Sequence, residues 1–417
     1  MSNTLDTLDL DYVHSQFPAL NGDWVFFDNA GGSQILRPAV DRITEFLYER
    51  NVQTGGSYAV SLAAADGLMK GRLAAQDLVN AARPEEIVFG PSTTALLQTL
   101  ANSIRSQFQP GDEVIVSMAD HESNIGPWER LREYGVVVKT WPIDPQSYQL
   151  RLEDLEPLMN ERTRLVCVTH CSNILGRVNP VEDIARFVHA HGAQICVDAV
   201  AYAPHRAIDV QAWDVDYYVF SLYKCYGPHT ALMYGKYDLL AELDGQYHYF
   251  YGKDKVPGKL EPGNPNYELA YSTDGIVEYL ASLGAKEGVE GTRREQLLAG
   301  YAAITRHENV LTQRLMSWLT ARNDCRVIGE TDVSGDDRVP TIAFKFDDLD
   351  SGEVAKAMDE HGIAIRFGDF HSRRLIENLG EQGNSGCVRV SMVHYNTLEQ
   401  VDRMTAALSQ IVSELRR

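Results

Sequence analysis

Between about residue 25 and residue 235, short apolar segments alternate with longer helical patterns, and this alternation constrains the fold more than any other feature. Seven segments have the composition of buried strands, namely residues 86–89, 113–117, 136–140, 164–169, 194–197, 217–220 and 231–234. Helical patterns such as 94–108 and 181–191 separate them. Strands without polar–apolar alternation, separated by helices, are typical of a mostly parallel sheet covered on both faces. The sequence therefore predicts an α/β domain built on a seven-stranded sheet.

The pattern changes at residues 255–268, "KVPGKLEPGNPNYE", where glycine and proline interrupt the chain. Further on we expect helices at 293–322 and 351–361, strands at 341–346 and 387–392, and a last helix opened by a Thr397-x-x-Gln400 capping box. A chain of 417 residues is long enough for two domains of unequal size. We predict an N-terminal segment (1–25) that packs on the small domain, a large cofactor-binding domain (26–265), and a linker helix with a small C-terminal α+β domain (266–417).

Composition excludes some classes of function. The net charge of −20 argues against a general nucleic-acid binder or a protein bound to anionic membranes. The six cysteines form no CxxC pair and no metal-ligand spacing, so we expect reduced, structural thiols and no metal site. The N-terminus lacks the pattern of a signal peptide, and no apolar stretch reaches the length of a membrane span. These features predict a cytoplasmic protein.

Polar residues follow several of the predicted strands, at the sheet edge where α/β proteins bind ligands. Ser92, Thr93 and Thr94 open a helix in "GPSTTALL", and such an arrangement can bind a phosphate. Helix capping alone explains one of these three hydroxyls more easily than all of them. His121 in "MADHESNIGPW" and Asn173 in "HCSNILG" also follow strands, although a surface loop and a polar turn are common places for these residue types.

Two charged residues at strand ends need a specific explanation. Asp198 directly follows "ICV", and a buried carboxylate there must either cap the next helix or pair with a cation. Lys224 in "YYVFSLYKCYGPH" (217–229) comes just past a core strand, three residues after Ser221. A lone lysine there most often bends into solvent. Alternatively it is a nucleophilic amine, whose pKa falls because its site is dry.

Pyridoxal 5′-phosphate accounts for all of these residues together. This cofactor needs a lysine for its Schiff base, a carboxylate on its pyridinium nitrogen and an anion site for its phosphate. It also needs a neighbour over one face of the ring and a donor near the phenolic oxygen. Each signal is weak alone, but their order and shared location predict a pyridoxal-phosphate site.

The same residues, in the same order, resemble the class V aminotransferase and cysteine desulfurase family, which has the type I fold of pyridoxal-phosphate enzymes. The resemblance runs from "FFDNAGGSQ" (26–34) to "VRVSMVHYNT" (388–397). It implies a role for each of these residues: phosphate binding by Thr93, Thr94 and Ser221, ring stacking by His121, a contact with the phenolic oxygen by Asn173, one with the pyridine nitrogen by Asp198, and the Schiff base by Lys224. It also implies that Arg389 in "CVRVSM" binds the substrate carboxylate, a task suited to a bidentate guanidinium.

The chain departs from the family pattern at four places. Tyr223 lies where desulfurases commonly have a histidine before the lysine, and Ala201 lies where a glutamine is frequent. Asn264 in "EPGNP" takes the place of a threonine that the neighbouring subunit lends to the phosphate. The loop that carries the persulfide-forming cysteine resembles "RFGDFHSRR" (366–374), which offers His371 or Ser372 instead. No cysteine lies between Cys325 and Cys387, so the resemblance does not extend to ordinary persulfide transfer.

We therefore expect a homodimeric pyridoxal-phosphate enzyme that acts on a small L-amino acid. Lys224 would move the Cα proton, and Tyr223 could supply the acid for elimination, transamination or racemisation. The resemblance favours C–S bond cleavage, desulfurase-like or lyase-like, without the usual persulfide cysteine. An aminotransferase or an amino-acid racemase or epimerase is the alternative, and a non-catalytic cofactor-binding protein is an alternative of another class. A sulfur-acceptor protein as a partner is left open.

Overall fold

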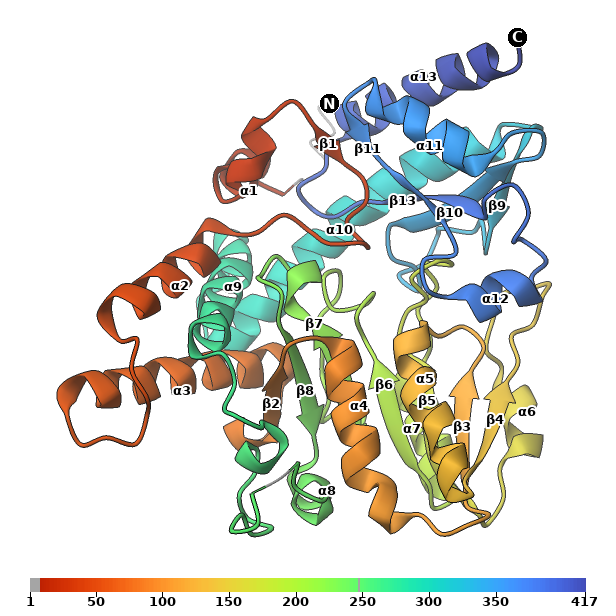
Figure 1. Cartoon of the computed structure of the whole chain (residues 1–417). Coiled ribbons are helices and arrows are strands. Elements are labelled where there is room, and N and C mark those ends of the chain that lie inside the picture. Colours follow the sequence, from red (N-terminus) through yellow and green to blue (C-terminus); the bar gives the residue numbers. More distant parts are fainter. Residues whose placement is uncertain (1–7, 247) are drawn as a thin grey trace.

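The computed structural model describes residues 8–246 and 248–417. Its larger sheet has seven strands (Figure 1). In spatial order they are β2 (Ile87–Gly90), β8 (Ala231–Gly235), β7 (Tyr217–Ser221), β6 (Gln194–Asp198), β5 (Thr163–Thr169), β3 (Glu113–Ser117) and β4 (Val137–Trp141). Only β8 runs antiparallel to its neighbours, and the other adjacent pairs are parallel. The predicted mostly parallel seven-stranded sheet is confirmed.

Helices cover both faces of this sheet, as expected for strands that are buried along their whole length. One core contains side chains from α4 (Thr93–Ile104), α5 (Gly126–Glu129) and α8 (Tyr237–Glu242). The core on the other face contains side chains from α3 (Ala59–Val79), α7 (Val181–Ala190), α9 (Tyr267–Lys286) and the first half of α10 (Arg293–Thr320). The short helix α6 (Leu152–Leu155) lies beside the β4 edge (Figure 1).

A second, antiparallel sheet forms the smaller C-terminal unit. Its order is β12 (Arg366–Gly368), β13 (Cys387–Ser391), β10 (Thr341–Phe346) and β9 (Cys325–Ile328). The second half of α10, α11 (Ser351–Asp359) and α13 (Leu398–Leu415) supply the rest of its core, while α12 (Arg373–Asn378) follows β12. The capping box predicted at Thr397 and Gln400 opens α13. The predicted small α+β domain is therefore confirmed as part of the fold.

The N-terminal segment contacts both units. Strand β1 (Val25–Phe26) pairs in parallel with β11 (Ile363–Ala364) beside the smaller sheet. Helix α1 (Leu10–Ser15) instead packs on α9, where the Tyr12 hydroxyl lies 2.7 Å from that of Ser282. The predicted segment 1–25 thus touches more than the small domain, and its residues 1–7 lie outside the described part of the chain. The division into these three predicted segments stays a prediction.

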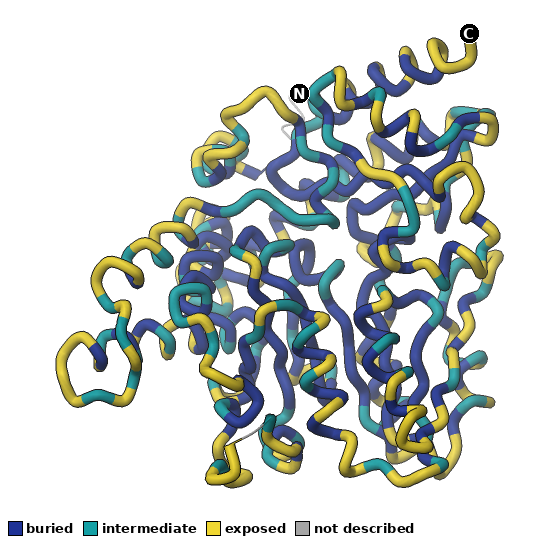
Figure 2. The backbone as a smooth tube through the Cα atoms, viewed as in Figure 1, coloured by how far each residue is buried: buried dark blue, intermediate teal, exposed yellow. Residues whose placement is uncertain are grey.

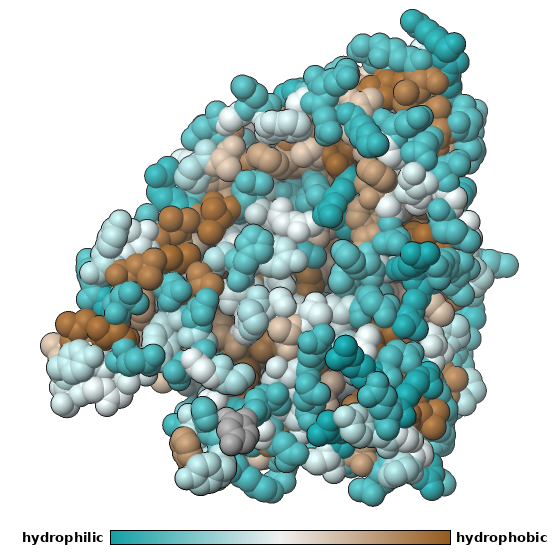
Figure 3. Space-filling view, viewed as in Figure 1, coloured by the Kyte–Doolittle hydropathy of each residue, from teal (hydrophilic) through white to brown (hydrophobic). Residues whose placement is uncertain are grey.

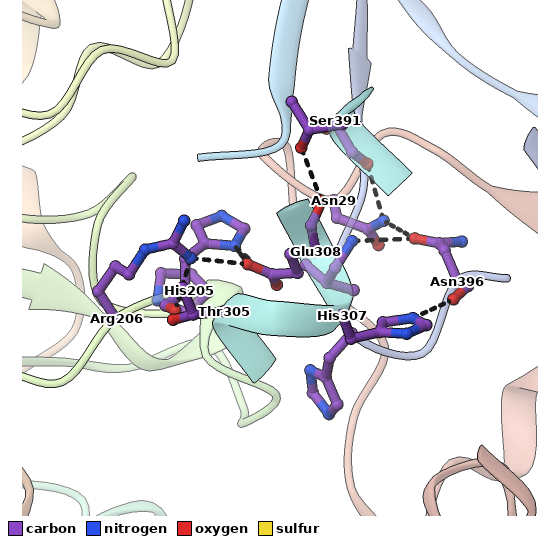
Figure 4. Close-up of polar contacts among 12 residues, drawn as sticks. Asn29, His205, Arg206, Thr305, His307, Glu308, Ser391 and Asn396 are labelled. Carbon is purple, nitrogen blue, oxygen red and sulfur yellow. Dashed lines mark hydrogen bonds and ion pairs between the residues drawn. The ribbon is translucent and has the colours of Figure 1, made fainter. Parts of the chain in front are cut away.

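Helix α10 crosses from one core to the other, and a buried polar network marks the crossing (Figure 4). Glu308 has no exposed surface, and its carboxylate lies 3.0 Å from His205 Nδ1 and 3.2 Å from Arg206 Nη1. The neighbouring His307 lies with Nε2 2.8 Å from the carbonyl oxygen of Asn396. Because a buried charge must stay paired, this network ties the large unit to α10 at one place.

Helices α2 (Arg37–Glu49) and α3 project from the body of the molecule, and Figure 2 shows exposed residues along them. Large apolar side chains gather on this projection (Figure 3). We call the exposed residues Val40, Leu47, Tyr48, Tyr58, Val60, Leu62, Met69 and Leu73 the α2–α3 patch. Within residues 8–246 and 248–417, no helix combines the length and apolar character needed to cross a bilayer.

Candidate active site

A cavity lies at the carboxyl ends of the parallel strands, where the sequence predicted a ligand site. Eight predicted site residues line it: Thr93, Thr94, His121, Asn173, Asp198, Ser221, Tyr223 and Lys224. A second, adjoining cavity shares four of these residues (His121, Asn173, Tyr223 and Lys224) and adds Arg389. The fold therefore brings nine of the ten predicted residues to one place.

Lys224 ends a 3₁₀ turn (Leu222–Lys224) that follows β7 directly. Burial lowers the pKa of its ammonium to about 8, and the charge of Arg389 acts in the same direction, while Asp198 and Asp28 oppose both. A lysine with this pKa is partly neutral close to physiological pH. Only the neutral amine is nucleophilic, so the surroundings of Lys224 suit the role that the sequence predicted.

Asp198 is the last residue of β6 and is only 3% exposed. Its Oδ1 accepts a hydrogen bond of 2.9 Å from the N–H of Val200, whereas its buried Oδ2 has no hydrogen-bond partner among the described residues. Burial raises the pKa of Asp198 to about 6, against the Val200 hydrogen bond and the charge of Lys224. A buried carboxylate oxygen without a partner fits a cationic N–H donor such as a protonated pyridine nitrogen.

The hydroxyl-rich start of α4 forms another end of the cavity. Ser92 caps the helix, because its Oγ accepts a hydrogen bond of 3.1 Å from the N–H of Ala95. Thr93 Oγ1 lies 2.7 Å from Ser221 Oγ, so this pair joins α4 to the end of β7. Thr94 is exposed and also lines the cavity. One hydroxyl thus serves as the cap, and the other three surround a helix N-terminus that suits a phosphate.

His121 precedes a short 3₁₀ turn (Glu122–Asn124), and its Nδ1 accepts a hydrogen bond of 3.1 Å from the N–H of Ser123. Burial and the positive charge of Lys224 lower the pKa of His121 to about 3, so its imidazole is neutral. A neutral, fixed ring suits stacking on a cofactor better than it suits proton donation.

Asp120 holds this turn in place, and sequence reasoning missed it. Its buried carboxylate accepts hydrogen bonds from Asn124 Nδ2 (2.7 Å), from the N–H of Thr169 (3.0 Å) and from the hydroxyl of Ser117. Burial raises its pKa well above the usual value. The only signal in the sequence was an acidic residue immediately after an apolar strand, which is also ordinary in turns.

Arg389 lies in the middle of β13 and is 2% exposed. Its Nη2 donates to Asp28 Oδ1 (3.0 Å) and its Nη1 to the carbonyl oxygen of Asn173 (3.2 Å), while its buried Nε has no partner in the described structure. The guanidinium lies 4.0 Å above the ring of Phe370. Arg389 is thus held on two sides, and three of its five N–H groups remain for a ligand carboxylate. Asp28, which orients it, was also missed.

The remaining predicted residues differ in position. Tyr223 stacks on His229 at 5.0 Å, and burial raises the pKa of its phenol. Asn264 is exposed, has a positive φ of 68°, and lines neither cavity. Its predicted role belonged to a neighbouring subunit, so one chain leaves that prediction open.

The cysteines of the described chain provide no reactive thiolate at the site. Cys171 lines the first cavity, but burial raises the pKa of its thiol to about 12. Cys387 is buried in β13, and its pKa is likewise raised to about 12. Cys225 is buried next to Lys224 and lines neither cavity. A persulfide-forming cysteine acts as a thiolate, which burial disfavours at each of these positions.

The fold, together with a lysine, a buried carboxylate and a hydroxyl-rich helix start around one cavity, defines a pyridoxal-phosphate-dependent enzyme of fold type I. The family model described as "Aminotransferase class-V" matches residues 25–404. The chain belongs to the class V aminotransferase and cysteine desulfurase family, whose members use pyridoxal 5′-phosphate and act on amino acids.

Relatives and solved structures agree with this assignment. The aminotransferase-like protein FGM3 of Gibberella zeae is 41% identical over 411 residues, which cover 97% of this chain and 98% of that protein. A cysteine desulfurase of Dickeya dadantii is 31% identical over 431 residues, which cover 99% and 98% of the two chains. The crystal structure of the cysteine desulfurase CsdA of Escherichia coli matches with a TM-score of 0.83 at 25% identity, over 98% of this chain and 99% of that one.

Proposed function

We propose that this enzyme cleaves the bond between Cβ and sulfur in a small L-amino acid of the cysteine type, as a lyase that releases pyruvate, ammonia and sulfide. One observation carries the proposal: two adjoining cavities that share Lys224 bring Asp198 and Arg389 together, but the described chain offers no reactive thiol there. The amino-acid chemistry is thus supported, while the persulfide step of a desulfurase lacks its nucleophile.

The residues divide the work as follows. When bound, pyridoxal phosphate supplies an electron sink for the substrate's Cα carbanion. Lys224 would hold the cofactor and then accept the Cα proton, for which its lowered pKa of about 8 is suited. Asp198, whose Oδ2 has no partner in the described structure, would keep the pyridine nitrogen protonated. Arg389 would bind the substrate carboxylate with its remaining N–H groups, and His121 would cover one face of the ring.

The first test is to give the holoenzyme L-cysteine and identify the carbon product. We expect pyruvate, ammonia and sulfide in equal amounts. Alanine with sulfide would mean desulfuration with another thiol as acceptor, and the lyase proposal would be wrong. No turnover, with a spectral response to other amino acids, would instead favour transamination or racemisation, and no response to any amino acid would favour a non-catalytic binding protein.

The same assay tests the carboxylate site. Arg389→Ala should raise the KM for L-cysteine at least about tenfold, because it removes a buried, charge-assisted contact, and should leave the cofactor's absorbance in place. Arg373→Ala is the matched control, since Arg373 is an exposed arginine whose ion pair in the described structure is with Glu377. Loss of the cofactor from the Arg389 variant would contradict the assignment.

We also propose that two copies of this chain associate through the α2–α3 patch. Tyr48 is 86% exposed and Leu62 58%, and a cluster of large apolar side chains of this kind is typical of an interface. A partner would also give the exposed Asn264 a site to contact. A cytoplasmic location fits the six free cysteines, because reduced thiols persist in a reducing compartment.

Sedimentation equilibrium tests this association. We expect a mass of twice the chain's 46.6 kDa, and a shift toward the monomer in Leu62→Glu, since a carboxylate would be desolvated at the interface. Leu415→Glu is the control, because Leu415 is an exposed leucine near the end of α13, outside the patch. A monomeric wild-type protein, or an equal effect of both variants, would contradict the proposal.

A further inference from the structure

The loop of residues 366–374 has an unusual backbone where it faces the cavity. Phe370 and His371 follow β12 in succession with positive φ values of 51° and 59°. Two consecutive residues other than glycine in the left-handed region are uncommon, and such a conformation persists only where the surroundings determine it.

Three hydrogen bonds hold the loop in this conformation. Asn173 Nδ2 donates to the carbonyl oxygen of Phe370 (3.0 Å), and Ser372 Oγ donates to Asn173 Oδ1 (2.7 Å). The N–H of Glu122 donates to the carbonyl oxygen of His371 (2.8 Å). At the end of the loop, Arg374 binds both carboxylate oxygens of Glu122, at 3.0 and 3.1 Å. The loop is therefore tied to Asn173 and to the turn that carries His121, as a fixed wall of the cavity.

This wall presents the imidazole of His371 to the substrate side of the site. His371 lines the cavity that also contains Lys224 and Arg389, and its ring centroid lies 5.3 Å from that of His121. The side chain is exposed, so it can exchange protons with water. It thus lines the same cavity as the lysine proposed to accept the Cα proton and the arginine proposed to bind the substrate carboxylate.

The other candidate acids of the cavity are less suited to proton donation. His121 has a pKa of about 3 and is neutral, and burial raises the pKa of the Tyr223 phenol. The thiol of Cys171 is buried, with a pKa of about 12. An imidazole open to solvent is the usual general acid near neutral pH.

We propose that His371 is a catalytic residue that donates a proton to the sulfur, or similar group, leaving Cβ. This role rests on the lyase function proposed above. Lys224 takes the Cα proton, the Cβ–S bond breaks with its electron pair on sulfur, and the N–H bond of His371 breaks as an S–H bond forms. With one water, L-cysteine yields pyruvate, ammonia and hydrogen sulfide, and His371 regains its proton from solvent. No oxidant or reductant is needed.

A comparison of two leaving groups tests the role. L-cysteine and β-chloro-L-alanine give the same carbon product, but chloride leaves without a proton. His371→Gln should lower kcat for L-cysteine by about 10²-fold, within the usual contribution of a general acid, and change the initial rate with β-chloro-L-alanine by less than about twofold. His191→Gln, at an exposed histidine after α7, is the control and should affect neither substrate.

Two readouts separate this role from a structural one. The affinity for L-alanine, which has no leaving group, is measured from the absorbance of the bound cofactor and should be the same in His371→Gln as in the wild type. The unfolding midpoint of the cofactor-free variant should also be unchanged, because the His371 side chain is exposed.

Three results would overturn the assignment. An equal loss with both substrates would mean that His371 only positions the site, and no loss with L-cysteine would mean that it has no role. If Tyr223→Phe alone showed the dependence on the leaving group, Tyr223 would be the acid. In each case the wild type still turns over both substrates, whereas a wild type inactive with both would overturn the lyase function as well.

Discussion

Replacing Lys224 with alanine is expected to lower turnover of any amino-acid substrate by at least about 10³-fold, because one side chain both holds the cofactor and moves the Cα proton. The cofactor should also become removable by dialysis. Borohydride treatment followed by peptide mass spectrometry should locate the reduced cofactor on Lys224 in the wild type and on no peptide in the variant.

A matched control and a rescue sharpen this experiment. Lys356→Ala, at an exposed lysine of α11, should leave turnover and labelling unchanged. Added methylamine should restore part of the activity of Lys224→Ala, since a free amine can then serve as base. If borohydride labelled another lysine in the wild type, Lys224 would have been misassigned.

Asp198→Asn should stabilise the cofactor-free protein but slow turnover by the cofactor-bound enzyme. Asp198 has a pKa of about 6 in the fold against 3.8 ordinarily, so its ionisation disfavours the folded state. This cost is absent below about pH 4 and complete above about pH 6. At 1.36 kcal/mol per pKa unit it amounts to roughly 3 kcal/mol. Asparagine removes the charge but also the attraction to Lys224, so we expect the apoprotein to gain about 1–3 kcal/mol at pH 8.

With cofactor bound, the same substitution should lower kcat by at least about 10²-fold, because a neutral amide does not keep the pyridine nitrogen protonated. Urea unfolding of the apoprotein at pH 8 and pH 4 measures the first effect, which should fade at pH 4. Asp112→Asn is the control and should destabilise the apoprotein at pH 8. The N–H of Gln109 and the charge of Arg164 lower the pKa of Asp112 despite its burial, so its ionised form stabilises the fold. An apoprotein destabilised at pH 8 by Asp198→Asn would contradict the account.

Much of the fold follows from apolar runs bounded by polar residues. The predicted bounds of the strands Glu113–Ser117 and Thr341–Phe346 match the structure at both ends. The helix predicted over 94–108 instead begins at Thr93 and ends at Ile104, followed by the 3₁₀ turn Arg105–Gln107. Three adjacent hydroxyls in the sequence do not reveal which one caps the helix, and apolar spacing does not distinguish the two helix types.

The site residues at strand ends were predictable because parallel strands end at one edge of the sheet. Residues that act through contacts with distant parts of the chain could not be predicted in this way. Asp28 matters because it pairs with Arg389, 361 positions further along the chain. The sequence revealed that the 366–374 loop lacks a cysteine, but its attachment to Asn173 and Glu122 depends on tertiary contacts alone.

The buried network around Glu308 fixes the distance between the two units that carry the site residues. The large unit carries Lys224 and the smaller C-terminal unit carries Arg389. The network attaches α10 to both units where the helix passes between them. Opening that joint would strand a carboxylate without water or partner, at a cost of several kcal/mol. The spacing between Lys224 and Arg389 is therefore a property of the folded chain itself. New substrate preferences can arise through changes in the loops that line the cavity. The spacing of Lys224 and Arg389, which bind the part common to all amino acids, stays unchanged.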